Sequence, residues 1–199
     1  DSWKYTGGTN CWAGMTLDEK RGVVFAGIGS PSFDYWAGNR VGDNLFGNCV
    51  LALDALTGKR KWHYQIVHHD VLDYDMPAQP ALVSVKINGK NVDAVAQPTK
   101  QGYLFFLDRE TGKPIYGVEE RPIPASKMPG EVLAKTQPHP LKPPPLTLPL
   151  VGAVAAALLL ATRWPRALTR GVVALGALGL FADLASWWLA RPDFLATTL

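Results

Sequence analysis

The chain has 199 residues, of which 47% are hydrophobic and 19% are charged, a composition that excludes an intrinsically disordered protein. Its 2 cysteines are too few for a disulfide-stabilised miniprotein, and its 19 glycines and 16 prolines argue against a helical bundle. The net charge of +3 comes entirely from residues 141–199, because residues 1–140 contain 15 basic and 15 acidic side chains. Since residues 1–140 contain no basic run, no nucleic-acid partner is expected.

Up to about residue 120, short β-rich runs alternate with turn signals. Strand composition and length are found at residues 23–27, 49–53, 61–65, 81–85 and 103–107. Asn88 and Gly89 lie between two apolar runs, which predicts a two-residue hairpin. No segment of this region has a convincing helical pattern. The sequence therefore predicts an all-β fold here.

An internal repeat supports this prediction. The segment Leu51–Trp62 recurs as Phe105–Tyr116, with Asp, Thr, Gly and Lys in register and an aromatic residue at the end of each copy. A repeat of this length is typical of one supersecondary unit, such as the four-stranded blade of a β-propeller. The Asp-x-x-Thr-Gly part suits a tight turn between two outer strands. Two unrelated hairpins with similar turns are the alternative.

Residues 121–149 are rich in proline and predict an extended linker rather than a folded unit. Beyond them, Leu146–Thr162 contains no charge and Gly171–Ala190 contains one, Asp183. The two apolar segments predict a transmembrane helical hairpin. A buried helical pair in a soluble domain is the weaker alternative, because neither segment has a polar face for water. Asp183 is a functional candidate inside a membrane span, or else lies at the membrane interface.

The expected domains are a propeller fragment at 1–140, a proline-rich linker at 141–149 and the helical hairpin at 146–199. Three arginines lie in the short connection between the two apolar segments, at positions 163, 166 and 170. By the positive-inside rule this connection is cytoplasmic, and residues 1–145 lie on the opposite side of the membrane.

Five segments, in the same order, resemble the pyrroloquinoline quinone (PQQ) dehydrogenases, especially the branch that oxidises glucose and related sugars and alcohols. The segments are residues 8–12, 29–31, 68–80, 97–103 and 107–112. The resemblance covers about residues 1–140. It implies two to three blades of an eight-bladed β-propeller, with PQQ and Ca²⁺ or Mg²⁺ as cofactors.

The resemblance also assigns site residues. Asp73 corresponds to the catalytic base, and Lys100 to the cation beside the reactive quinone carbonyls. Trp12 corresponds to the aromatic floor on which PQQ stacks. The expected metal ligands are Asp73 and Ser30, the latter at a position where many members have Asn. Serine is a poorer neutral oxygen donor for Ca²⁺ than an amide, and Leu72 also departs from the family, in which Trp commonly precedes the base.

Each assignment has a structural alternative. Asp73 could be a turn residue, Lys100 a solvated surface charge, and Trp12 a core residue. His68 and His69 are adjacent, and adjacent residues on a strand point to opposite faces, so we expect them to shape a pocket or to pack rather than to bind a metal together.

The two cysteines leave two possibilities open. Cys11 and Cys49 could form a disulfide in an oxidising compartment, or they could both be small buried thiols.

Together these features predict a PQQ-dependent dehydrogenase at the periplasmic face of the inner membrane. It would transfer a hydride from a sugar or alcohol to PQQ and pass electrons to ubiquinone or a cytochrome c. Eight blades need about 400 residues, so we expect this chain to be an interior or C-terminal piece whose remaining blades come from upstream sequence or another chain. The alternatives are a non-catalytic, membrane-anchored propeller scaffold and an inactive truncated fragment.

Overall fold

The computed structural model describes residues 7–146, which contain nine β-strands and no α-helix. This confirms the prediction of an all-β fold for this part of the chain. No helix among residues 7–146 is long and apolar enough to cross a membrane. Apart from Leu146 at its start, the predicted transmembrane hairpin, including Asp183, lies outside the described residues.

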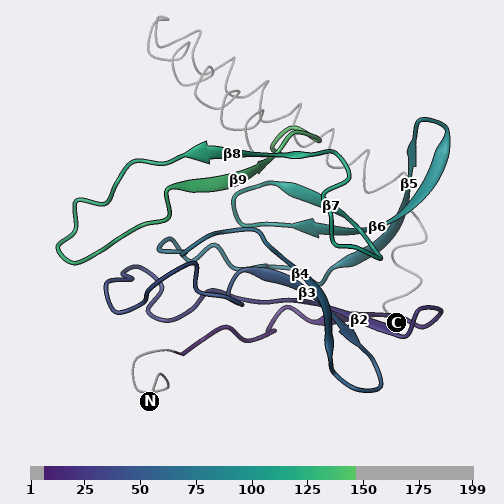
Figure 1. Ribbon diagram of the computed structural model, residues 1–199, viewed down its shortest axis with the longest axis horizontal. Coiled ribbons are helices and arrows are strands. Elements are labelled where there is room, and N and C mark those ends of the chain that lie inside the picture. Colours follow the sequence, from purple (N-terminus) through teal and green to yellow (C-terminus); the bar gives the residue numbers. More distant parts are fainter. Residues whose placement is uncertain (1–6, 147–199) are drawn as a thin grey trace, which may run out of the picture. The chain divides into compact units, whose positions relative to one another are not determined.

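The first sheet is an antiparallel meander of four strands, in the order β1-β2-β3-β4 (Figure 1). Its strands are β1 (Met15–Asp18), β2 (Val23–Gly27), β3 (Cys49–Asp54) and β4 (Arg60–Gln65). The strands at the centre of the sheet, β2 and β3, are largely buried and apolar, as expected of strands covered on both faces. A four-stranded meander is the arrangement that the repeat length predicts for a propeller blade.

The second sheet has three antiparallel strands, β5 (Ala81–Ile87), β6 (Lys90–Pro98) and β7 (Leu104–Asp108). Its first two strands form the long hairpin that extends at the right of Figure 1. Asn88 and Gly89 both have positive φ, at 49° and 79°, and these angles match the two-residue turn predicted from the sequence.

A fourth strand begins beside β7 but does not continue. Leu107 forms an isolated bridge with Pro114, and the amide of Ile115 donates to the carbonyl of Phe106 at 2.8 Å. Pro114 occupies the position in the second repeat that Arg60 occupies in the first. Because proline has no N–H, the regular ladder that forms β4 in the first copy cannot form here.

The two Asp-x-x-Thr-Gly segments adopt the same turn. In the first, Asp54 Oδ1 accepts from the Thr57 amide at 2.8 Å and the Thr57 hydroxyl at 2.7 Å. In the second, Asp108 Oδ1 accepts from the same two groups of Thr111, both at 2.8 Å. The repeat predicted from the sequence is therefore a structural repeat.

The prediction that residues 121–149 form only an extended linker is wrong, because β8 (Val118–Pro122) and β9 (Thr136–Pro140) pair into a two-stranded ribbon. Each strand of a two-stranded ribbon has an open edge, which tolerates prolines that lack the N–H a central strand needs. The ribbon is hydrogen-bonded to the loop that follows β4. The side chain of Gln137 accepts from the amide of His68 at 2.8 Å and donates to the carbonyl of His68 at 2.6 Å.

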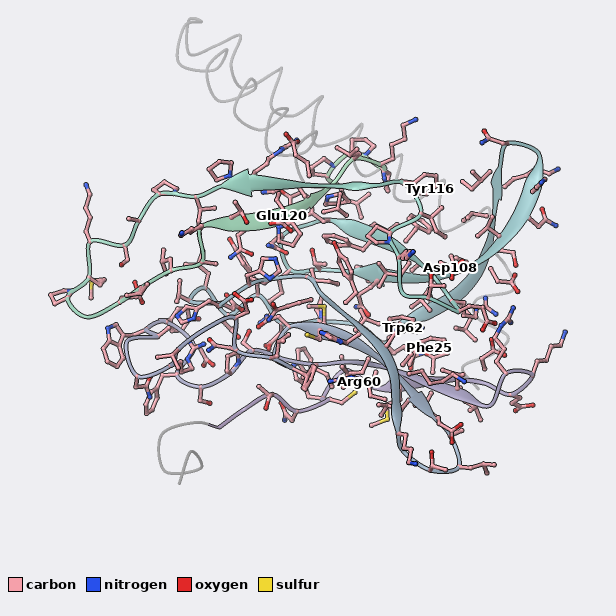
Figure 2. The ribbon with its side chains drawn as sticks, viewed as in Figure 1. Phe25, Arg60, Trp62, Asp108, Tyr116 and Glu120 are labelled. Atoms are coloured by element: carbon pink, nitrogen blue, oxygen red, sulfur yellow. The ribbon has the colours of Figure 1, made fainter. Side chains whose placement is uncertain are left out.

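One apolar core joins the two larger sheets. Fully or nearly fully buried side chains come from both, among them Phe25, Val50, Trp62, Phe105 and Leu107. Figure 2 shows Trp62 and Phe25 close together, with the turn at Asp108 beside them, and the two rings pack with centroids 5.6 Å apart.

Trp62 ends the first repeat and contacts the turn of the second. Its indole Nε1 donates to the carbonyl of Arg109 at 3.2 Å. Its ring covers Gly112, where an added Cβ would be 2.5 Å from Trp62 Cε3. The aromatic residue of one repeat therefore packs on the glycine of the next, which explains why the sequence pairs them in this pattern.

A charged network also links the two sheets. The buried carboxylate of Asp18, on β1, accepts from Arg21 at 3.0 Å and from Arg109 at 3.1 Å. Arg21 further pairs with Asp93 of β6 at 2.8 Å and with Glu110. Because Asp18 is 4% exposed, its charge depends on these two guanidinium groups.

We predict that Gly112→Ala destabilises the chain more than Gly58→Ala. Both glycines have nearly the same φ, 71° and 69°, so both substitutions carry the cost of a left-handed alanine, about 1–2 kcal/mol. Only at Gly112 does the new methyl group meet a rigid ring, which adds about 1–3 kcal/mol; at Gly58 nothing lies within 4 Å. Urea unfolding of the full chain measures the difference, and equal losses would contradict the contact with Trp62.

We predict that Asp18→Asn lowers the urea midpoint at neutral pH and flattens its pH dependence. Burial alone would raise the pKa of Asp18, but hydrogen bonds from Arg109 and Arg21 outweigh it and hold this pKa below its ordinary value. Because the pKa of Asp18 is lower in the folded chain than in the unfolded chain, where it is about 3.9, this carboxylate stabilises the fold at pH values above 3.9. The stabilisation is lost as the pH falls through the pKa of Asp18 in the folded chain.

Urea midpoints measured between pH 3 and pH 7 check this prediction. Glu19→Gln, on the exposed β1–β2 turn, is the control and should keep the slope of the unsubstituted chain. An Asp18→Asn slope equal to that of the control would show that the network does not stabilise the fold.

Candidate active site

The candidate site is built on the loop that follows β4, and this loop is organised around the carboxylate of Asp70. Asp70 is 2% exposed. Its Oδ1 accepts from the amide of Leu72 at 2.9 Å, and its Oδ2 accepts from the amide of Tyr74 at 2.6 Å. A short side chain that binds backbone amides two and four residues ahead holds the loop in a tight turn.

The same carboxylate oxygen fixes the loop to the first sheet. Asp70 Oδ2 also accepts from the hydroxyl of Ser30 at 2.6 Å and from the side-chain amide of Asn48 at 2.9 Å. Ser30 lies shortly after β2, and Asn48 directly precedes β3. Four donors thus satisfy a buried carboxylate that would otherwise be costly to remove from water.

Two residues of this loop have left-handed backbone conformations, His69 at φ 45° and Asp73 at φ 55°. Histidine and aspartate are among the non-glycine residues that adopt this region more readily than most. The turn around Asp70 brings the side chain of Asp73 to Lys100, which follows β6.

Lys100 bridges two carboxylates. Its Nζ is 2.9 Å from Asp73 Oδ2 and 2.9 Å from Asp75 Oδ2. Burial would lower the pKa of Lys100, but its hydrogen bonds to the two aspartates outweigh it and raise this pKa. Burial would likewise raise the pKa of Asp75, but hydrogen bonds from the Ser30 amide and from Lys100 lower it. The cluster therefore holds a lysine cation next to carboxylate groups.

Trp12 lies beside this cluster. An added Cβ at Gly29 would be 2.7 Å from Asp75 Oδ1 and 3.2 Å from Trp12 Nε1, so Gly29 allows both side chains to approach the same stretch of backbone. Trp12 is 52% exposed, which excludes a core role for it and leaves its ring accessible to a planar ligand. Trp12 thus lies near Asp75, which Lys100 links to Asp73.

Ser30 takes part in this site through its backbone rather than its hydroxyl. Its amide donates to Asp75 Oδ1 at 2.6 Å, while its hydroxyl donates to Asp70 and accepts from Asn48 at 3.1 Å. The residue is 6% exposed. Its oxygen is thus already occupied by the buried network.

The described residues do not by themselves form a calcium site. Ca²⁺ takes six to eight oxygen ligands, whereas here two carboxylates, those of Asp73 and Asp75, share one lysine ammonium. Residues 7–146 contain no group of three or more His, Cys, Asp or Glu side chains arranged to hold a metal. For PQQ the residues fit better, since Lys100 would offer a cation to its oxygens and the exposed ring of Trp12 a surface for stacking.

Three residues that form the site, Asp75, Asp70 and Asn48, were not predicted from the sequence. Both aspartates lie in the segment 68–80 that carries the resemblance, but a single chain gives no signal for which carboxylate is buried. Asn48 is a polar residue directly before a buried strand, and that position is a signal for a side chain that binds a neighbouring loop.

The histidine prediction needs one correction: His68 and His69 lie in the loop after β4, not on a strand. They do point to different partners. The ring Nδ1 of His68 is 2.7 Å from Gln65 Oε1, and that of His69 is 2.6 Å from the carbonyl of Gly42.

The two cysteines are both free thiols. Cys11 donates to the carbonyl of Gly14 and Cys49 to that of Gly47, each at 3.3 Å. Burial raises the pKa of Cys49 to about 12, so this thiol is unreactive.

We predict that Lys100→Met raises the pKa of Asp75 toward its ordinary value, because the substitution removes a hydrogen bond and a positive charge that lower it. Carboxyl ¹³C shifts followed through a pH titration measure the change. Lys90→Met, at the exposed start of β6, is the control and should leave the pKa of Asp75 unaltered. An unchanged pKa in Lys100→Met would contradict the bridge.

The chain is similar to known dehydrogenases over most of its described residues. The chain is 46% identical over 138 residues to quinate/shikimate dehydrogenase (quinone) of Acinetobacter baylyi, a match that covers 68% of this chain and 17% of the relative. It is 39% identical over 130 residues to quinoprotein glucose dehydrogenase of Escherichia coli, covering 65% of this chain and 16% of the relative. The chain thus spans about one sixth of the length of these relatives.

A solved structure and a family description complete the comparison. The crystal structure of quinohemoprotein alcohol dehydrogenase from Comamonas testosteroni is similar with a TM-score of 0.52 and 31% identity, over 68% of this chain and 20% of that one. Residues 1–174 match the PQQ family described as glucose/ethanol/alcohol dehydrogenase, beta-propeller domain. The chain therefore belongs to this family of PQQ β-propeller dehydrogenase domains.

Proposed function

We propose that the chain forms part of a PQQ-dependent dehydrogenase that oxidises a sugar or alcohol by hydride transfer to PQQ. The observation that carries this proposal is the cluster in which Lys100 Nζ lies 2.9 Å from Asp73 beside the exposed ring of Trp12. Such a cluster combines a proton acceptor, a cation and a stacking surface. Relatives named as quinate, glucose and glycerol dehydrogenases support the same reaction class.

Each residue of the cluster has a role in this proposal. Asp73 would accept the hydroxyl proton of the substrate, and Lys100 would stabilise negative charge that develops on a nearby oxygen. Trp12 would orient the planar cofactor by stacking. When bound, PQQ supplies the electrophilic carbon that accepts the hydride. Asp75 and the Ser30 amide would keep Lys100 in place during the reaction.

The proposal includes a metal and further blades. Asp73 would contribute to a Ca²⁺ or Mg²⁺ site, and Ser30 would join it only if its hydroxyl left Asp70. Other oxygen ligands would come from blades of the eight-bladed propeller outside the described residues, supplied by the same protein or another chain. This expectation is consistent with the fact that the chain matches only 17% and 16% of the length of the two relatives.

We also propose ubiquinone or a cytochrome c as the electron acceptor, and a position at the periplasmic face of the inner membrane. The relative named as a dehydrogenase (quinone) and the one named as a quinohemoprotein support the two kinds of acceptor. The localisation rests on the apolar segments within residues 146–190 of the sequence.

We predict that Asp73→Asn lowers dye reduction, dependent on PQQ and Ca²⁺, by about 10²–10⁴-fold, because it removes the proton acceptor. The assay uses membranes of cells that express the full chain in its natural context, with sugars and alcohols as substrates. PQQ binding, followed as quenching of tryptophan fluorescence, should remain, since Trp12 and Lys100 are unchanged.

Glu19→Gln is the matched control, because it neutralises an exposed carboxylate on the β1–β2 turn. It should reduce the dye at the rate of the unsubstituted chain. Full dye reduction by Asp73→Asn would rule out its role as the base. Absence of PQQ-dependent quenching in the unsubstituted chain would rule out the cofactor.

A further inference from the structure

Two loops at one end of the strands carry exposed apolar side chains. One loop connects β2 to β3 and the other connects β8 to β9, and both lie at the left of Figure 1. Val41 and Tyr35 of the first loop are 90% and 72% exposed, and Val132 of the second is 77% exposed. We call six exposed apolar residues of these loops the loop surface: Phe33, Tyr35, Trp36, Val41, Met128 and Val132.

The two loops contact each other, so these side chains form one surface. The amide of Ala37 donates to Oε1 of Glu131 at 3.2 Å. Val41 and Val132 line the same hollow between the loops. A contiguous exposed apolar area marks an interaction site, whereas apolar side chains exposed singly do not.

The fold holds the first loop in this exposed position. Arg40 is buried, and its guanidinium Nη2 donates to the carbonyl of Phe33 at 2.9 Å and to that of Asp70 at 2.9 Å. The buried guanidinium thus connects the backbone of this loop to the loop that follows β4. The apolar side chains are therefore kept in water by the architecture, which is unfavourable unless an apolar partner covers them.

The described residues end near the same end of the strands. The amide of Leu146 donates to the carbonyl of Gly102 at 2.8 Å, and Gly102 lies in the β6–β7 loop that carries Lys100. Like the β2–β3 loop, this loop is opposite the β1–β2, β3–β4 and β5–β6 turns. In the sequence, Leu146 begins the uncharged segment that predicts the first membrane span. A chain that enters a bilayer from this point brings this end of the strands to the lipid surface.

The composition of the loop surface fits a lipid headgroup region. Tryptophan and tyrosine are enriched where a membrane meets water, because their rings have an apolar body and a polar edge. Residues 28–48 and 123–135 contain three basic and three acidic side chains, so the two loops have no net charge. The turns at the opposite end of the strands instead present exposed lysines, at positions 20, 59, 86, 90 and 113.

A further propeller blade is a less suitable occupant than lipid. The two larger sheets of this chain pack together through a shared core that includes Phe25 and Phe105. Another blade would cover the outer face of a sheet in the same way. The loop surface lies beyond the ends of the strands, where a bilayer can reach it.

We propose that the loop surface lies in the headgroup region of a lipid bilayer and orients the domain on the membrane. Its side chains would insert shallowly, as those of an interfacial apolar face do. The cluster of Asp73 and Lys100 then lies at the membrane-facing end of the domain. The inference rests on the membrane position proposed above, and it uses neither PQQ nor the chemistry of Asp73.

The test uses nitroxide spin labels on the full chain, reconstituted in vesicles of phosphatidylcholine. This lipid has no net charge, so attraction to lysines does not contribute. Tyr35→Cys and Val132→Cys place a label on each loop. Leu56→Cys is the matched control, because Leu56 is 96% exposed on the β3–β4 turn at the opposite end. The background is Cys11→Ser, which keeps a hydrogen-bond donor at that position, while Cys49 is fully buried.

Electron paramagnetic resonance measures collisions of each label with oxygen, which concentrates in lipid, and with a nickel chelate, which stays in water. We expect the labels at positions 35 and 132 to collide with oxygen several-fold more often than the label at position 56, and with nickel several-fold less often. Phe33→Ser combined with Val41→Ser should bring the label at position 35 several-fold closer to the control, because less apolar area remains to insert.

Three results would overturn the proposal while the chain stays with the vesicles. Labels on the loops that collide with nickel as often as the control would show that the loop surface is in water. Labels shielded from both reagents would show that protein covers it. Oxygen collisions unaltered by the two serine substitutions would show that the apolar side chains do not hold the loops in lipid.

A chain that does not stay with the vesicles would contradict the proposed membrane position as well as the loop surface. None of the three earlier results bears on that position or on dye reduction that depends on Asp73. The inference and the proposed function therefore fail separately.

Discussion

The carboxylate of Asp70 is the interaction on which the candidate site depends. It is buried, and it binds donors from the loop itself, from Ser30 after β2 and from Asn48 before β3. Removing any one donor would leave part of a buried charge unsatisfied, at a cost of about 1–3 kcal/mol. The loop conformation, the left-handed backbone of Asp73 and the approach of Asp73 to Lys100 all follow from this one arrangement. A polar residue in the interior thus specifies the geometry of a polar site at the surface.

Local features of the fold were predictable from the sequence because they depend on neighbouring residues. The turn at Asn88, the two Asp-x-x-Thr-Gly turns and the central strands each rest on side chains within a few positions. The β8–β9 ribbon was not predictable in this way. Its prolines indicate extended backbone, but whether such backbone pairs depends on a distant contact, the one between Gln137 and His68.

The candidate site likewise has features that the sequence predicts and features that depend on distant contacts. The resemblance assigns roles to Trp12, Asp73 and Lys100, and these roles stay predictions; in the structure Lys100 contacts Asp73 and Asp75, and Trp12 lies near Asp75. The resemblance could not show that Ser30 presents its amide to Asp75 and its hydroxyl to Asp70, because that orientation depends on burial and on packing against Asn48. The position of this serine in the family pattern predicts where it lies. It does not predict whether its backbone amide or its hydroxyl faces the candidate site.

The contact between Trp62 and Gly112 has a further consequence for assembly. It is a heterologous contact, in which the end of one repeat binds the turn of the following one, and the two surfaces are different. Contacts of this kind propagate in one direction, so the order of blades in space must follow their order along the chain. Repetition with a constant rotation ends either in an open helix or in a closed ring. In a closed ring each repeat has a following neighbour, so a contact like that of Trp62 on Gly112 can form at every position, whereas an open helix leaves its last repeat without one.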